Sequence, residues 1–171
     1  GIAAVDRDRR SVAELPLVVD GLEGALGRTI DLAAVAGRHG GVELDVGWWH
    51  GDCTPWNMLA RAGRTYLWDW EFAAPDRPVG FDLLHHRFER LRRRPGVDPA
   101  HALDALLIEV DAVLDEAGVA ADASVRAATV DLYLCELLAR ELTLEGQRWS
   151  GGTMALLGPA LVERIERRLA T

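Results

Sequence analysis

The sequence predicts a single, mainly α-helical domain with one small β-hairpin. Two observations favour helices: leucine and valine recur at helical spacing in residues 103–114, and residues 130–144 are apolar on more than one helical face. One stretch favours a hairpin, because the extended runs 58–61 and 64–70 flank a turn with a glycine. A chain of 171 residues is long enough to bury a sizeable core in one domain.

The first forty residues predict short helices and no strand. Residues 1–10 are charged and aperiodic, so no element is expected there. Residues 11–27 carry apolar side chains at helical spacing and predict one helix. Asp31 is a suitable N-cap for a short helix over residues 32–36, which we expect to end at Gly37.

The middle of the chain predicts extended segments around a polar loop. Residues 42–49 are expected to be extended and to run into that loop. Ala62-Gly63 forms the hairpin turn, where glycine supplies a positive φ. Residues 73–79 predict a loop by their composition.

Helices are expected to fill the second half. The first carries apolar residues from Phe81 to Leu91 and three arginines at its end, and the next is capped by Asp98-Pro99 and ends at Gly118. A break at residues 149–152 then separates the last two helices, which span about residues 122–145 and a segment that begins near Pro159.

Composition excludes several classes of protein. The formal net charge of −8 argues against nonspecific nucleic-acid binding and slightly favours cationic or neutral ligands. No run of about 18 apolar residues occurs, so no membrane span is expected. Two cysteines make no disulfide framework; one disulfide fits their number, but reduced thiols in a cytoplasmic protein are the simpler expectation. The chain begins with Gly1 rather than Met and has no signal-peptide pattern, which suggests part of a longer or processed chain.

One polar motif stands out in the middle of the chain. His50-Gly51-Asp52 is followed five residues later by Asn57, and Asp69 comes twelve residues after that, between two tryptophans. A carboxylate can accept the proton of a substrate hydroxyl, and amide and carboxylate oxygens are ligands that Mg²⁺ prefers. The hairpin should return the chain so that Asp69 lies beside Asn57, where one metal could touch both.

This pattern resembles the aminoglycoside phosphotransferase and choline kinase branch of the kinase-like fold. The resemblance rests on HGD-x4-N, the later WDWE and then GFDL at residues 80–83, and HGDCTPWN is similar to HGDFxPWN variants of bacterial small-molecule phosphotransferases. It implies that residues 1–171 are the C-terminal, catalytic lobe of such an enzyme. That enzyme would transfer the γ-phosphate of ATP or GTP to a hydroxyl of an aminoglycoside, a choline-like alcohol or a sugar.

The resemblance also implies roles for five residues. Asp52 would orient the acceptor hydroxyl and take its proton, and Asn57 and Asp69 would bind Mg²⁺ together with the nucleotide phosphates. His50 would brace the metal-binding segment through a hydrogen bond, and Asp82 would accept hydrogen bonds from the loop backbone.

Structural alternatives exist for these residues. Asp52 and Asn57 could be ordinary loop and turn residues, and Asp82 could only stabilise a helix N-terminus. His85 and His86 are expected on a helix surface or in the core rather than in the site.

Five of the six tryptophans lie between Trp48 and Trp70. They could stack against a ring-shaped substrate, but packing of the loop is the favoured role. An apolar patch is expected near Trp48 and Trp49 and could drive self-association.

The sequence departs from the resemblance in one respect. It contains no lysine and no glycine-rich strand loop, both of which hold nucleotide phosphates in kinases. A nucleotide-binding lobe is therefore expected in cis or on a partner chain, and residues 1–171 alone are expected to fold but not to turn over. The rival hypothesis is a kinase-like binding or regulatory module without catalysis. A metal hydrolase is disfavoured, because the candidate ligands lack HExxH or comparable spacing; they are His50, Asp52, Asp69, His85 and His86.

Overall fold

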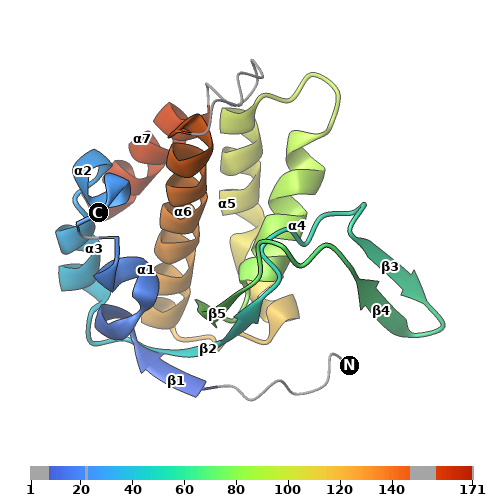
Figure 1. Cartoon of the computed structure of the whole chain (residues 1–171), viewed down its shortest axis with the longest axis horizontal. Coiled ribbons are helices and arrows are strands. Elements are labelled where there is room, and N and C mark those ends of the chain that lie inside the picture. Colours follow the sequence, from blue (N-terminus) through green and yellow to red (C-terminus); the bar gives the residue numbers. More distant parts are fainter. Residues whose placement is uncertain (1–7, 22, 147–156, 171) are drawn as a thin grey trace.

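The fold is mixed α/β, which corrects the prediction of a mainly helical domain with one hairpin. The computed structural model describes residues 8–21, 23–146 and 157–170. Within these ranges the chain forms seven α-helices and two small sheets, of three and two strands, with 57% helix and 16% strand. The single-hairpin prediction is wrong because it missed the whole three-stranded sheet (Figure 1).

The three-stranded sheet is antiparallel, in the order β1-β2-β5. Its central strand β2 (Glu43–Trp49) pairs with β1 (Asp8–Ser11) on one side and with β5 (Ala74–Pro78) on the other. Both outer strands are charged and lack apolar alternation, so composition predicted no element for one and a loop for the other. Their pairing with β2 decides their conformation, and a proline such as Pro78 is tolerated on an edge strand.

Two tryptophans at the end of β2 depart from its alternation, where the pairing with β5 is irregular. Leu44 and Val46 point into the core, as alternation requires. The pairing with β5 then shifts between Gly47 and Trp49. The extra residue lies on β5, where two residues separate Ala74 from Arg77 opposite the single Trp48. At this irregularity the alternation of β2 ends, and Trp49 is 3% exposed whereas Trp48 is 62% exposed.

The N-terminal helices are shorter than predicted. Instead of one helix over residues 11–27, the chain forms a 3₁₀ turn, α1 (Pro16–Val19) and α2 (Ala25–Thr29). The break lies at Gly21, where a Cβ would meet the Leu17 carbonyl oxygen at 2.4 Å.

Asp31 caps α3 (Leu32–His39) as predicted, accepting the Ala34 N–H at 2.9 Å. The helix continues past Gly37, so the predicted end there is wrong.

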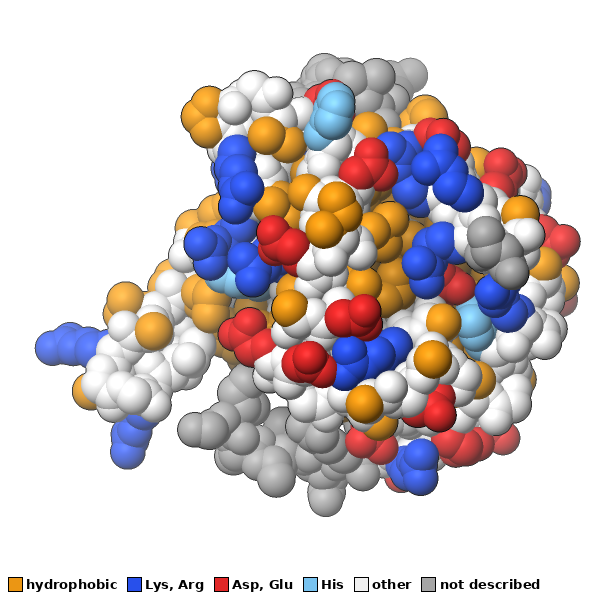
Figure 2. Space-filling model, turned by 180° about the vertical axis from the view of Figure 1, so that it is seen from behind, with side chains coloured by type: hydrophobic (Ala, Val, Ile, Leu, Met, Phe, Trp, Pro, Cys, Tyr) orange, Lys and Arg blue, Asp and Glu red, His pale blue; other side chains and the backbone are white. Residues whose placement is uncertain are grey.

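The hairpin is present as predicted. Strands β3 (Met58–Arg61) and β4 (Arg64–Leu67) flank Ala62 and Gly63, which both have positive φ, 50° and 72°. The second strand ends at Leu67 rather than residue 70. Figures 1 and 2 show this hairpin as an arm, residues 58–67, that projects from the rounded body of the molecule.

Four longer helices follow, in the predicted order, and form the main core with the sheet at one end (Figure 1). They are α4 (Phe81–Arg92), α5 (Pro99–Ala117), α6 (Ala123–Gly146) and α7 (Leu157–Leu169). Asp98 caps α5 by accepting the His101 N–H at 2.9 Å, and Gly118 ends it with φ 71°, both as predicted. The predicted break at 149–152 lies outside the described residues. None of the described helices is both long and apolar enough to cross a bilayer.

A buried charged cluster joins α3, α6 and α7. Asp131 lies in the middle: its carboxylate is 2.7 Å from His39 Nε2 and accepts a hydrogen bond from Arg168 Nε. The side chains of His39 and Asp131 are each only 4% exposed. A buried charge without partners is costly, so the three helices depend on one another through this carboxylate.

We expect Asp131→Ala to lower the free energy of unfolding by about 3 kcal/mol, because it leaves the buried His39 without its partner. Urea denaturation followed by circular dichroism measures this. The control is Asp111→Ala, which removes an exposed partner of Arg126 and should cost much less. Equal losses in the two variants would contradict a special role for the cluster.

Candidate active site

His50 connects three parts of the site. Its backbone N–H donates to both carboxylate oxygens of Asp82 on α4, at 3.2 Å each. Its ring Nε2 lies 2.9 Å from the Trp68 carbonyl oxygen, and its Nδ1 lies 3.2 Å from the Asp52 backbone nitrogen. A carbonyl accepts and an N–H donates, so the ring hydrogen must be on Nε2.

Asp52 and Asn57 are in direct contact. Asn57 Nδ2 donates to Asp52 Oδ2 at 2.7 Å and to the Asp52 carbonyl oxygen at 3.1 Å. The same carbonyl accepts the Thr54 N–H at 2.8 Å, which closes the loop into a tight turn. Asn57 is buried, whereas the Asp52 side chain is 25% exposed and faces a cleft. Both Asn57 bonds use Nδ2, and its Oδ1 is the atom with metal-binding chemistry.

Gly51 allows the loop to lie against the chain that leaves the hairpin. Its φ is 83°, and a Cβ at this position would meet the Phe72 carbonyl oxygen at 2.1 Å. From the other side, Arg140 on α6 donates to the Gly51 carbonyl oxygen. The Arg140 guanidinium also lies 5.0 Å from the Trp49 ring centre and 5.1 Å from that of Phe72. The loop is thus enclosed between two elements that are far apart in the sequence.

Asp69 lies at the exit of the arm and is exposed. The bonds that position this exit involve its neighbour Trp68, whose N–H donates to the Asn57 carbonyl oxygen at 3.3 Å and whose carbonyl accepts from His50. Asp69 itself has φ 66°, a left-handed conformation that costs a non-glycine residue about 1–2 kcal/mol. The structure therefore brings Asp52 and Asn57 into contact and places Asp69 one residue from the bonds that hold the arm to the loop.

The sequence analysis placed His85 outside the site and did not consider Tyr133, but His85 lies against Asp52 and Tyr133 lies against His85. His85 on α4 has its Nε2 at 3.6 Å from Asp52 Oδ1, longer than a well-formed hydrogen bond, and its Nδ1 at 3.3 Å from the Tyr133 hydroxyl. One signal could have identified His85: it follows Asp82 by three residues on a helix, so both face the same loop. Tyr133 comes from α6, and no local pattern in the sequence links it to the loop.

The environments of the two loop-associated carboxylates move their pKa values in opposite directions. The contact with His85 lowers the pKa of Asp52, partial burial opposes this, and the charges of Arg140 and His50 lower it further. Burial raises the pKa of Asp82, although the backbone N–H of His50 lowers it. Asp52 is therefore the carboxylate that stays ionised at lower pH.

A cleft of about 720 Å³ opens beside Asp52. This volume suits a small organic molecule. Asp52 and His85 lie on its wall together with apolar side chains from the loop and the helices: Trp56, Phe72, Phe88, Leu137 and Leu157.

Two acidic side chains of this cleft, Glu89 and Glu136, have arginine partners. Glu89 accepts two hydrogen bonds from Arg92, at 2.9 and 2.8 Å, and lies 3.6 Å from Arg93. Glu136 accepts a bond from Arg77 at 2.9 Å. The cleft wall is therefore close to charge balance at these positions, in contrast to the acidic chain as a whole.

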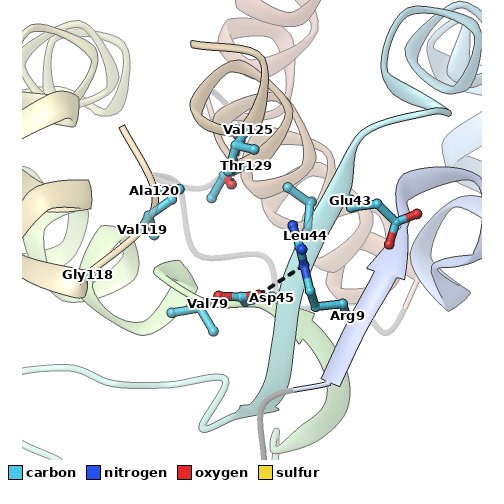
Figure 3. A pocket seen from close by; sticks show the side chains of 10 residues that line it. All are labelled: Arg9, Glu43, Leu44, Asp45, Val79, Gly118, Val119, Ala120, Val125 and Thr129. Carbon is cyan, nitrogen blue, oxygen red and sulfur yellow. Dashed lines mark hydrogen bonds and ion pairs between the residues drawn. The ribbon is translucent and has the colours of Figure 1, made fainter. Parts of the chain in front are cut away.

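A second, much smaller cavity lies between β1, β2 and the turn after α5. Figure 3 shows the Arg9–Asp45 contact beside it, with 3.5 Å between Arg9 Nε and Asp45 Oδ1. Its volume is about 50 Å³, so it has room for water-sized molecules only.

The donor chemistry of Asn57 and Asp69 fits Mg²⁺, which binds through a few protein oxygens and completes its shell with water and phosphate. Among the described residues, no group of three or more His, Cys, Asp or Glu side chains could hold a metal. A metal at this site would therefore take its remaining ligands from water or from a bound molecule.

Exposed aromatic side chains surround the site. They lie on the loop, on the arm and at its exit: Trp48, Trp56, Tyr66, Trp68, Trp70 and Phe72. Figure 2 shows hydrophobic side chains gathered where the arm joins the body. The expected apolar surface is present at Trp48, but Trp49 is buried against Phe81.

Comparisons with known proteins add no relative. No protein-family model matches the chain, and neither the curated proteins nor the solved structures gave a match. The kinase-like resemblance therefore rests on the residues of the motif.

The first prediction from the site compares two glycines with positive φ. Gly51→Ala should lower the free energy of unfolding by about 3 kcal/mol or more, because its Cβ would collide with the Phe72 backbone. Gly63→Ala should lower the free energy of unfolding by only about 1 kcal/mol, because alanine is strained in the left-handed conformation but no atom lies within 4 Å of its Cβ. Chemical denaturation of both variants tests this, and similar losses would contradict the close approach.

A second prediction from the site concerns how the two carboxyl groups titrate and how stability depends on pH. The pKa of the Asp52 carboxyl group should lie below the ordinary value of 3.8, and the pKa of the Asp82 carboxyl group should lie above it. Ionised Asp52 stabilises the fold above about pH 4, and this contribution is lost as the pH falls through its lowered pKa. The contribution of Asp82 to stability has the opposite pH dependence: it is complete below about pH 4 and is lost as the pH rises through the raised pKa. Carbon-13 NMR of the carboxyl groups, assigned with Asp52→Asn and Asp82→Asn, measures both; the reverse order would contradict the environments described.

Proposed function

We propose that the chain is the catalytic lobe of a phosphotransferase that moves the γ-phosphate of ATP or GTP to a hydroxyl group of a small molecule. The observation that carries this proposal is the carboxylate of Asp52, held by the buried Asn57 and exposed to a cleft large enough for such an acceptor. The kinase-like resemblance of the motif supports the same reaction. Since the donor is ATP or GTP, we propose the cytoplasm as its compartment.

In this reaction the acceptor oxygen attacks the γ-phosphorus. The new oxygen–phosphorus bond forms as the bond between that phosphorus and the β–γ bridging oxygen breaks, and the nucleoside diphosphate leaves. Asp52 orients the hydroxyl and takes its proton as the new bond forms, and its lowered pKa keeps it in the ionised form that can do so. Asn57 and Asp69 would hold Mg²⁺, which neutralises charge on the phosphates when bound.

The acceptor would occupy the cleft beside Asp52. Aminoglycosides, choline-like alcohols and sugars are candidates. The net charge of the chain favours a cation, but Glu89 and Glu136 already have arginine partners, which favours acceptors with few charges and an apolar part.

The nucleotide needs further contacts. Because the sequence has no lysine, we propose that a nucleotide-binding lobe in cis, or a partner chain, holds the phosphates. The exposed aromatic side chains around the loop favour such a partner surface, and self-association through them is an alternative. The same missing lysine favours the rival function, a kinase-like binding or regulatory module without catalysis.

Phosphate transfer from ATP and GTP should be measured in the intact protein, with its nucleotide-binding lobe or partner, across aminoglycosides, choline and sugars. We expect Mg²⁺-dependent transfer that falls at least about 100-fold in Asp52→Asn. The chain of residues 1–171 alone should not turn over. Nucleotide binding without transfer to any acceptor would favour the regulatory module.

The proposed binding of Mg²⁺ by Asp69 can be tested with a matched control. Asp69→Asn should raise the Mg²⁺ concentration needed for nucleotide binding about tenfold, because the metal loses a charged ligand. Asp76→Asn changes another aspartate with positive φ, 55°, and should leave this requirement unchanged. Asparagine tolerates the left-handed conformation, so neither change adds backbone strain. Calorimetry at several Mg²⁺ concentrations tests this, and equal values for the two variants would exclude Asp69 as a ligand.

A further inference from the structure

A row of three side chains leads from the helical core to Asp52. Tyr133 on α6 is buried, its hydroxyl lies 3.3 Å from His85 Nδ1, and His85 Nε2 lies 3.6 Å from Asp52 Oδ1. We infer that His85 is a positioning residue for Asp52 and that the Tyr133 hydroxyl sets the ring hydrogen of His85 on the side that faces Asp52. The kinetic part of this inference rests on the proposed phosphotransfer.

The direction of hydrogen bonding along these three side chains follows from Tyr133. It is 0% exposed, and burial raises the pKa of its hydroxyl well above the ordinary value, so the hydroxyl keeps its hydrogen. A buried hydroxyl needs an acceptor, and the unprotonated Nδ1 of His85 supplies one. The ring hydrogen of His85 is then on Nε2, which faces Asp52.

Aromatic contacts limit how far the His85 ring can turn. The Trp49 ring packs edge-on against it, at 6.2 Å between centres and 85° between planes, and the Tyr133 ring lies at 6.5 Å and 72°. Phe81 in turn packs edge-on against both Trp49 and Tyr133. The ring is therefore fixed by packing as well as by hydrogen bonding.

His85 and Asn57 hold different oxygens of the same carboxylate. Asn57 Nδ2 binds Oδ2 from the loop, and His85 Nε2 faces Oδ1 from α4. His50 cannot substitute for His85, because the Trp68 carbonyl and the Asp52 backbone N–H occupy both of its ring nitrogens. The hydrogen bond from Asn57 and the His85 ring on the other side, which come from separate elements, restrict rotation of the carboxylate. Small errors in the position of a catalytic group can cost a large factor in rate.

The kinetic test uses variants that separate positioning from packing. His85→Leu removes the donor and should lower kcat by about 10- to 100-fold, with the KM values of acceptor and nucleotide nearly unchanged. His85→Gln keeps an N–H near the position of Nε2 and should restore most of kcat. Tyr133→Phe should give a smaller loss than His85→Leu. Leu91→Val is the structural control: it weakens the core on the same helix, and should lower the melting temperature without changing kcat.

A second test needs no turnover. Nitrogen-15 NMR of histidine side chains in the 171-residue chain should show the His85 hydrogen on Nε2, with Nδ1 as an acceptor. Tyr133→Phe should populate the other tautomer. The carboxyl carbon signal of Asp52 should move in His85→Leu and Tyr133→Phe, and should stay in place in Leu91→Val.

The two tests distinguish the inference from the proposed function. A wild-type His85 with its hydrogen on Nδ1, or an Asp52 signal that moves as much in Leu91→Val as in His85→Leu, overturns the inference even if transfer is found. Transfer with equal kcat in wild type and His85→Leu also overturns it and leaves the proposed function standing. If no acceptor is phosphorylated, the NMR result decides the positioning, and only the proposed function fails.

Discussion

The hydrogen bonds of His50 are the interaction on which the candidate site depends. They tie the loop to α4 through Asp82, to the arm through Trp68, and to the backbone of Asp52. Only the tautomer with hydrogen on Nε2 satisfies both ring contacts, so one proton position joins three segments that are separate in the sequence. A two-stranded hairpin with exposed strands is marginally stable by itself, and these bonds fix its base.

Elements with strong local signals could be predicted from the sequence. Apolar periodicity, the Asp98 cap and Gly118 defined α5, and Ala62-Gly63 defined the hairpin turn. Strands β1 and β5 could not be predicted, because their residues are charged or turn-forming and only pairing with β2 makes them extended. The single helix expected over residues 11–27 is wrong although periodicity there continues across Gly21; the chain packs so closely at this position that a Cβ would meet the Leu32 side chain at 2.8 Å.

The site shows the same division between local and long-range information. The residues of HGD-x4-N were found through spacing within one loop, and two of them, Asp52 and Asn57, are in contact. Arg140 reaches Gly51 of the loop from 89 residues further along the chain, and Tyr133 on the same helix reaches His85 beside the loop, so no spacing within the motif could reveal them. The faces of Trp48 and Trp49 could not be predicted either, because the irregularity beside them is decided by the pairing of β2 with β5.

The two thiols offer an internal measure of how the molecule opens. Both are free and buried, and burial raises the pKa of each to about 12, so neither is reactive while its surroundings stay closed. Cys53 lies in the loop, whereas Cys135 lies in α6 at the centre of the core. A thiol reagent can attack each only during an opening event, so its rate at Cys53 reports local excursions of the loop and its rate at Cys135 reports opening of the core. The ratio of the two rates would show how often the loop opens while the core that holds it stays closed.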